Sequence, residues 1–136
     1  MVATKKLNYV YAVGKRRSAS ARVRLFKGKG ESRINEKSAS DYFSSLVNKD
    51  LWSKPFKVAD ASSKYYVTVK VNGGGLMGQL DAVAHGIAKA LTKENKEGFR
   101  KLLKKAGLLK RDSRIRERRK VGTGGKARRA KQSPKR

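Results

Sequence analysis

The chain has 136 residues, and its 36 Lys and Arg against 10 Asp and Glu give a formal net charge of +26. Self-repulsion on this scale destabilises a free compact protein, so a polyanion should supply the missing negative charge, and nucleic acid is the commonest one. The absence of Cys excludes disulfides, thiol catalysis and Cys-based zinc sites.

The N-terminal residues 1–7 lack the apolar stretch of a signal peptide, and no later apolar run approaches the length of a membrane-spanning helix. We therefore expect a cytoplasmic protein. The first predicted strand is uniformly apolar, because Tyr9, Tyr11 and Val13 alternate with Val10 and Ala12. This composition predicts a strand with both faces largely covered.

The next strand is predicted to have one apolar and one cationic face, since period-two spacing separates Ala21, Val23 and Leu25 from Arg22 and Arg24. The turn before it is also basic and carries Lys15, Arg16 and Arg17. Charge runs in turns are often merely solvated. A basic turn that continues into a cationic strand face favours RNA contact, and we expect these five cations to bind RNA.

Shorter elements are predicted in the middle of the domain. An extended piece is expected at 32–35, and Ser38 is placed to cap a helix through Phe43, with Asp41 in the capping-box position. The clearest strand covers 65–71, where Tyr65, Val67, Val69 and Val71 share one face. Its aromatic residues could stack on bases, but in a small domain we expect them to fill the core.

A glycine turn follows this strand and consists of Gly73, Gly74 and Gly75. With Gly78 it matches the G-x-G-x-x-G pattern of dinucleotide-binding proteins, which would make the chain a nucleotide-dependent enzyme. That function needs a second strand after the following helix, and none is predicted. The glycines therefore form either a tight turn or a site where backbone N–H groups hold an RNA phosphate.

Two helices are predicted after the turn. The first has one apolar stripe, formed by Met77, Leu80, Ala84, Ile87 and Leu91. The second covers 96–106 with Phe99, Leu102 and Leu103 inward, and Gly107 marks its end. His85 lacks a second ligand or nucleophile, and the acids form no catalytic pair. We therefore predict no catalytic residue, no metal site and no cofactor.

Residues 107–136 form a basic tail, with 13 Lys or Arg against Asp112 and Glu117 and no aromatic residue. Such a segment cannot offset its own ordering entropy, so we predict an α+β domain at 1–106 and a tail that is disordered until it binds RNA. Arg offers a planar fork for phosphates. The tail cations expected to bind RNA are Arg111, Arg114, Arg116, Arg118, Arg119, Lys120, Lys126, Arg128 and Arg129.

The tail alone indicates only a nucleic-acid-binding arm, because nuclear-localisation signals and histone-like tails have the same pattern. A free DNA-compacting protein therefore stays open at this point. A membrane surface is disfavoured, because from Lys110 onward the only large aliphatic residues are Ile115 and Val121.

Four ordered blocks of the sequence resemble the small-subunit ribosomal protein nine family. They are 13–23 with 34–35 and 41–43; 71–79 with 85–87 and 90–91; 103–108 with 111–112 and 117–122; and 126–130 with 135–136. Together they cover nearly the whole chain. The Lys135–Arg136 ending is similar to the bacterial and organellar branch, and a bacterial origin is favoured because no transit peptide fits ahead of Tyr9.

The resemblance implies a compact two-layer α/β domain like the second domain of another small-subunit ribosomal protein. It implies a non-enzymatic protein that binds ribosomal RNA in the head of the small subunit, beside neighbouring ribosomal proteins and without forming homo-oligomers. The tail would run toward the peptidyl site, where Lys135 and Arg136 would approach the anticodon stem-loop of transfer RNA. Pro134, and Lys131–Gln132 in place of an aromatic residue, depart from the family's usual ending.

Overall fold

The computed structural model describes residues 9–43, 46–61, 63–111 and 113–115. In chain order the elements are β1 (Tyr9–Arg16), β2 (Ala19–Lys27), β3 (Arg33–Ile34), β4 (Lys37–Ser38), α1 (Ala39–Tyr42), α2 (Leu46–Val58), β5 (Tyr65–Asn72), α3 (Leu76–Glu94) and α4 (Lys96–Lys105). The strands form one five-stranded sheet in the order β1-β2-β5-β3-β4. This architecture confirms the predicted α+β class.

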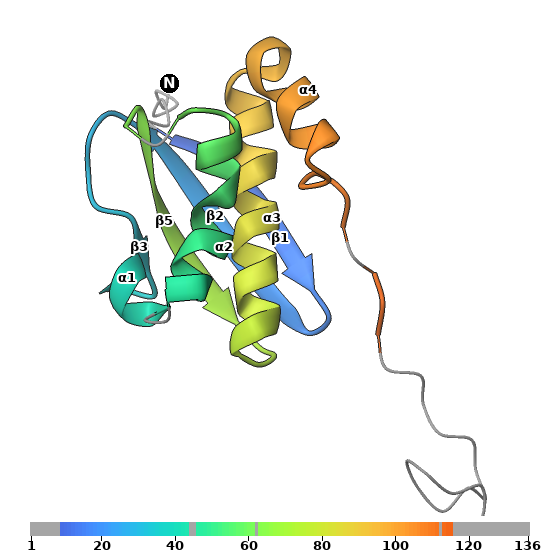
Figure 1. Ribbon diagram of the computed structural model, residues 1–136. Coiled ribbons are helices and arrows are strands. Elements are labelled where there is room, and N and C mark those ends of the chain that lie inside the picture. The colour runs from blue at the N-terminus through green and yellow to red at the C-terminus, as the bar shows by residue number, and fades with distance from the viewer. Residues whose placement is uncertain (1–8, 44–45, 62, 112, 116–136) are drawn as a thin grey trace, which may run out of the picture.

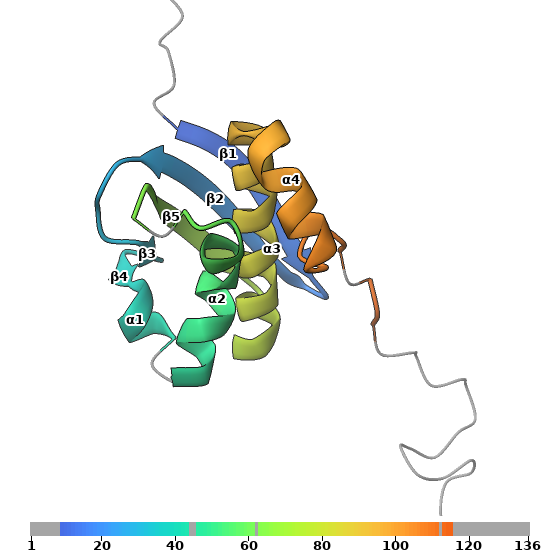
Figure 2. The ribbon, with the colours of Figure 1, turned by 45° about the horizontal axis from the view of Figure 1, so that its top comes forward.

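The helices α2, α3 and α4 lie on one side of the sheet, and α1 lies beside β3 and β4 at its edge (Figures 1 and 2). The three long strands β1, β2 and β5 are antiparallel neighbours, and β3 runs parallel to β5. Because none of the described helices covers the opposite side, one face of these strands is buried and the other is open.

The buried face follows the alternation of the sequence. On β2, Ala21, Val23 and Leu25 are at most 2% exposed, while Arg22 and Arg24 between them are exposed. The prediction for β2 is thus confirmed. The prediction that both faces of β1 are covered was wrong, because Tyr11 on the open side remains 42% exposed.

Helix α3 crosses β1 and β2 at very short range, and two glycines make this possible. A Cβ atom added to Gly14 of β1 would lie 1.9 Å from the backbone oxygen of Ala82, and one added to Gly86 would lie 2.6 Å from Val23 Cγ2. The stripe of α3 includes Leu80, Ile87 and Leu91 at 0% exposure. Met77 was wrongly placed in it. It lies in the first turn of α3 and is 57% exposed.

Helix α4 ends as predicted, at a glycine with left-handed backbone. Gly107 has φ +76°, its N–H donates to Lys104 O, and the N–H of Leu108 donates to Leu103 O, which together form a Schellman motif. Leu103 is buried, but Leu102 is 46% exposed. Adjacent helical residues point about 100° apart, so both could not face the core equally.

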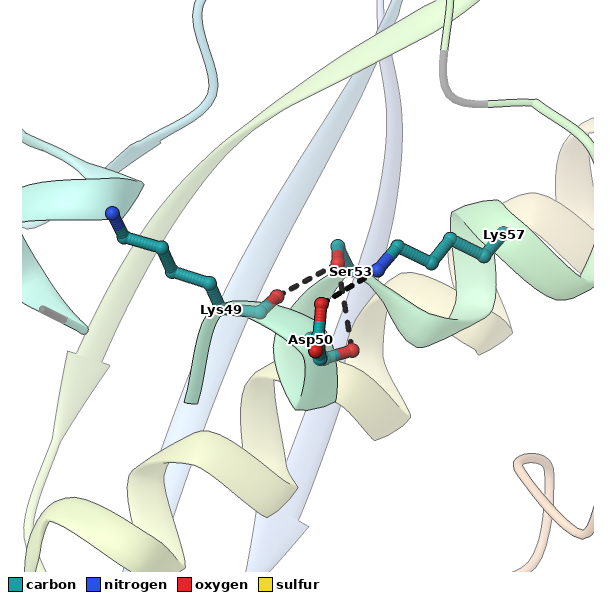
Figure 3. Close-up of polar contacts among 4 residues, drawn as sticks. All are labelled: Lys49, Asp50, Ser53 and Lys57. Carbon is teal, nitrogen blue, oxygen red and sulfur yellow. Dashed lines mark hydrogen bonds and ion pairs between the residues drawn. The ribbon is translucent and has the colours of Figure 1, made fainter. Parts of the chain in front are cut away.

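Helix α2 was not predicted from the sequence, because Pro55 lies inside it and interrupts the expected pattern. It is held to the core by Phe56, which is 4% exposed, and by partly buried Leu51 and Trp52. Its solvent side carries local polar contacts (Figure 3): Lys57 Nζ lies 2.7 Å from Asp50 Oδ1, and Ser53 Oγ donates to Lys49 O. Exposed pairs of this kind contribute little to stability.

The short elements agree only in part with the sequence. The extended piece expected at 32–35 is present as β3, and Ser38 is the N-cap residue of α1 as predicted. Its side chain, however, makes no capping hydrogen bond, so the capping-box assignment was wrong. The backbone N–H of Ala39 instead donates to Ser32 O, which ties α1 to the loop before β3.

Candidate nucleic-acid interface

The uncovered side of the three long strands, which we call the open face, carries cations and aromatic rings but no acid. Its side chains alternate with the buried ones and belong to Tyr9, Tyr11, Val13, Lys15, Ser20, Arg22, Arg24, Phe26, Tyr66, Thr68, Lys70 and Asn72. Strand pairing fixes their neighbours across the sheet. Because these side chains include cations and no acid, the open face attracts phosphate groups.

The cations of the open face converge around a small hollow. In the strand register Arg24 lies between Tyr11 and Thr68, and Arg22 lies opposite Lys70. The side chains of all five residues line the hollow. Arg22, Arg24 and Lys70 are exposed, so a bound anion can replace their hydration with charge-assisted hydrogen bonds. The structure thus brings the two predicted cations of β2 together and adds Lys70.

Sequence reasoning missed Lys70, although its signal was present. In β5 the buried residues Val67, Val69 and Val71 alternate with outward positions, and Lys70 occupies one of them. The residue was recognised only as part of a β-branched strand. Its pairing with Arg22 depends on the order of strands in the sheet, which the sequence pattern does not specify.

The predicted basic turn lies partly in β1, to which Lys15 and Arg16 belong, and its cations are in two different situations. Lys15 and Arg17 are exposed, and Arg17 adopts φ +54°. The side chain of Arg16 is only 11% exposed, its Nε lies 3.6 Å from Asp81 Oδ2, and its Nη1 donates to Arg114 O. Arg16 therefore links the turn to α3 and to the chain beyond α4.

The glycine turn packs directly against this basic turn. Gly73 and Gly74 have φ +78° and +63°, and a Cβ atom on Gly73 would lie 2.4 Å from Ser18 O. These two positions therefore require glycine for backbone reasons. Gly75 is the N-cap residue of α3, and a Cβ atom added to it would meet nothing within 4 Å. Two segments predicted to bind RNA thus lie side by side.

The nucleotide-binding alternative for the glycines loses its structural context. In a dinucleotide-binding unit a strand parallel to the first follows the helix. Here α3 is followed by α4, and no strand occurs after α3 in the described part of the chain.

The chain leaving α4 stays against the domain. Leu108 and Leu109 pack on the core, and His85 Nε2 lies 3.2 Å from Leu109 O. Burial lowers the pKa of His85 below its ordinary 6.5; the bond to Leu109 opposes this shift, and the charges of Lys89 and Arg111 add to it. Its Nδ1 is buried without a hydrogen-bond partner among the described residues. His85 is a neutral structural donor here.

The predicted tail cations are only partly described. Arg111 lines a hollow with Lys15, Lys89 and His85, and Arg114 lines the neighbouring one together with Lys15 and Arg16. The other predicted residues lie outside the described residues: Arg116, Arg118, Arg119, Lys120, Lys126, Arg128, Arg129, Lys135 and Arg136.

Lysines of α3 protect the outer edge of the sheet. Lys89 Nζ donates to Val13 O and Lys93 Nζ donates to Tyr11 O, so these two carbonyls of the edge strand β1 have hydrogen-bond partners. Among the described residues no group of acids and His could hold a metal ion, and no described helix is long and apolar enough to span a membrane.

Comparison with known proteins gives a consistent result. The sequence model of the family described as ribosomal protein S9/S16 matches residues 14–136. A protein of Desulfotalea psychrophila described as small ribosomal subunit protein uS9 is 45% identical over 115 residues, which cover 85% of this chain and 88% of that protein. Proteins with the same description from Cutibacterium acnes and Leifsonia xyli subsp. xyli are 43% and 45% identical over 125 residues. These alignments cover 92% of this chain and 72% and 74% of those proteins.

Proposed function

The chain belongs to the ribosomal protein S9/S16 family, and from this premise we propose how it works in the small ribosomal subunit: its folded domain docks on ribosomal RNA through the open face, and its tail reaches toward peptidyl-site transfer RNA. The family resemblance predicted from four sequence blocks is confirmed. Relatives with this description are structural proteins of the small subunit and not enzymes, and ribosomal RNA binding is general among them.

One observation supports docking through the domain more than any other. The open face presents Arg22, Arg24 and Lys70 around one hollow, and none of its side chains is acidic. The exposed Lys15 near the end of β1 and the exposed Arg17 just after it continue the same charge. Each phosphate contact releases condensed counterions, so a cation cluster of this size provides sequence-independent affinity for an RNA backbone.

The basic turn and the glycine turn support a second contact at the end of the sheet. Because Gly73 packs on Ser18, RNA that binds Arg17 also approaches the backbone at the start of α3. Backbone N–H groups at a helix N-terminus favour phosphate oxygens. We assign Gly73, Gly74 and Gly75 to this contact through their backbone. The positive φ of Gly73 and Gly74 is an independent reason for glycine at those two positions.

The proposal for the tail rests on the family match, which continues to the last residue. From residue 115 to residue 136 an extended chain spans roughly 70 Å, so Lys135 and Arg136 can act far from the domain. Cations at that distance can meet a transfer RNA backbone without affecting how the domain docks. In this scheme the partners are small-subunit ribosomal RNA, neighbouring ribosomal proteins and peptidyl-site transfer RNA in the cytoplasm.

Fractionation of a lysate on a density gradient tests the basic assignment. The protein should sediment with small subunits and remain there after a moderate salt wash, because its dissociation requires many contacts to break at the same time. Sedimentation with DNA, or at the top of the gradient, would instead support a free DNA-binding protein or an unassembled one. A matched fraction treated with ribonuclease should release the protein.

A further inference from the structure

We propose that the open face holds an unpaired nucleotide of the RNA, with its base stacked on Tyr11 and its phosphates held by Arg22, Arg24 and Lys70. This inference rests on the proposed function and specifies what kind of RNA structure meets the sheet. A base that is paired inside a duplex cannot reach a flat protein surface, whereas a base in a loop or bulge can turn out and stack on an aromatic ring.

Three of the four rings on the open face are already engaged with one another. Phe26 and Tyr66 are stacked with centroids 5.2 Å apart, and Tyr9 lies 5.6 Å from Phe26. The guanidinium carbon of Arg24 lies 5.2 Å from the centre of the Tyr9 ring. These contacts engage the three rings at one end of the open face, and Arg24 lies between Tyr9 and the hollow.

Tyr11 is the ring that remains. It is 42% exposed, lies opposite Arg24 in the register, and makes no ring contact within the described part of the chain. Its side chain lines the hollow together with the cations of β2 and β5. An exposed tyrosine ring offers a stacking surface for any base, because every base has a π face.

The other residues of the hollow match the rest of a nucleotide. Arg22, Arg24 and Lys70 present positive charge for phosphate oxygens, and the Thr68 side chain adds a hydroxyl that can pair with a ribose 2′-OH. An acidic protein segment would use the cations but would leave the ring of Tyr11 without a stacking partner. A duplex would also use only the cations. The combination favours an unpaired nucleotide.

Photo-crosslinking in purified small subunits tests this inference. Tyr11 is replaced by p-benzoyl-L-phenylalanine, a photoreactive aromatic residue, and Arg17 is replaced in the same way as a reference on the basic turn. Crosslinks from position 11 should map to one nucleotide that is unpaired. Crosslinks from position 11 to a neighbouring protein, or to nucleotides within a continuous duplex, would overturn the inference.

A second measurement separates stacking from mere proximity. In subunits carrying Tyr11→Leu, the base identified by crosslinking should become more reactive to a reagent that modifies exposed bases, whereas Tyr11→Phe should keep it protected. Loss of one stacked base should weaken RNA binding by about ten-fold or more. Equal protection in both variants would contradict stacking.

The failure of the inference can be distinguished from failure of the proposed function. If position 17 crosslinks to ribosomal RNA while position 11 does not, the chain docks on RNA but not through a base on Tyr11. If neither position crosslinks to RNA and the protein is absent from small subunits, docking itself is wrong. The crosslinking arm retains an aromatic residue at position 11, so it decides the matter even if Tyr11→Leu does not assemble.

Discussion

The imidazole Nε2 of His85 lies 3.2 Å from the carbonyl oxygen of Leu109 and donates a hydrogen bond to it. Five residues further on, the carbonyl oxygen of Arg114 accepts a hydrogen bond from Arg16 Nη1 at 3.1 Å. The backbone that leaves α4 is therefore held at two points by the domain, beyond the boundary at residue 106 predicted from composition. These contacts set the direction in which the chain departs from α4.

The burial of His85 predicts a measurable pH dependence of stability. Burial keeps the pKa of His85 below 6.5 in the folded protein, so the unfolded chain takes up a proton first as the pH falls. The contribution of neutral His85 to stability is complete above pH 6.5 and is lost as the pH falls from there through the lowered folded pKa. Since the chain has one His, its proton NMR signals can be followed without ambiguity.

A titration midpoint at or above 6.5 in the folded protein would contradict this picture. His85→Gln provides the control, because its amide can donate to Leu109 O without titrating. The free energy of unfolding of this variant should lose its dependence on pH in that interval.

The close approach of β1 and α3 predicts a strong effect of one methyl group. In Gly14→Ala the new Cβ would lie 1.9 Å from Ala82 O, so the helix must move away from the sheet. We expect destabilisation of about 1–3 kcal/mol or more, measured by urea unfolding of the free protein. Gly75→Ala is the matched control, since nothing lies within 4 Å of its Cβ position and its φ is −92°. Equal destabilisation in both variants would mean that the close approach does not constrain packing.

The open face predicts a difference between two sets of three cations. Replacing Arg22, Arg24 and Lys70 by Ala should reduce the log–log salt slope of small-subunit RNA binding by about 0.7 to 0.9 for each phosphate that is no longer bound. The control replaces the exposed Lys54, Lys96 and Lys101 on α2 and α4, which lie on the opposite side of the sheet. It changes the net charge equally. If the control flattens the slope as much, the open face has no special part in binding.

The tail predicts a separation between assembly and transfer RNA binding. Deleting Lys135 and Arg136 should leave small subunits assembled, because the open face and the basic turn remain. It should speed dissociation of peptidyl-site transfer RNA by roughly ten-fold, as expected for the loss of one or two charge-assisted hydrogen bonds. Equal dissociation rates over a range of salt and magnesium would show that the two residues do not contact transfer RNA. Subunits that fail to assemble would assign them a structural role.

The elements that the sequence predicted are those whose pattern is local. The alternation of Val23 and Arg22 in β2, and of Val69 and Lys70 in β5, reflects one buried and one open face, and any such strand has this pattern. Helix α2 was missed because Pro55 interrupts it and its stability comes from packing beside α3. The sequence pattern also predicted Met77 on the apolar stripe of α3. Met77 is exposed because it lies in the first turn of that helix.

The candidate site was predicted in its parts but not in its arrangement. Arg22 and Arg24 were recognised because they repeat at period two, whereas Lys70 joins them only through the pairing of β2 with β5. Arg16 belongs to the same basic run as Arg17. Its partial burial depends on Asp81 and Arg114, which are distant in sequence. Contacts of that kind follow from the fold and have no local signal.

The most direct test of docking through the open face is the accessibility of residue 70 before and after assembly. The chain has no Cys, so Lys70→Cys provides a single thiol on the open face, and Lys101→Cys provides a reference on α4. In the free protein both thiols should react with a maleimide at similar rates. In purified small subunits Lys70→Cys should become protected, and ribonuclease digestion should restore its reactivity. A thiol at position 70 that reacts equally fast in the free protein and in the subunit would contradict docking through this face.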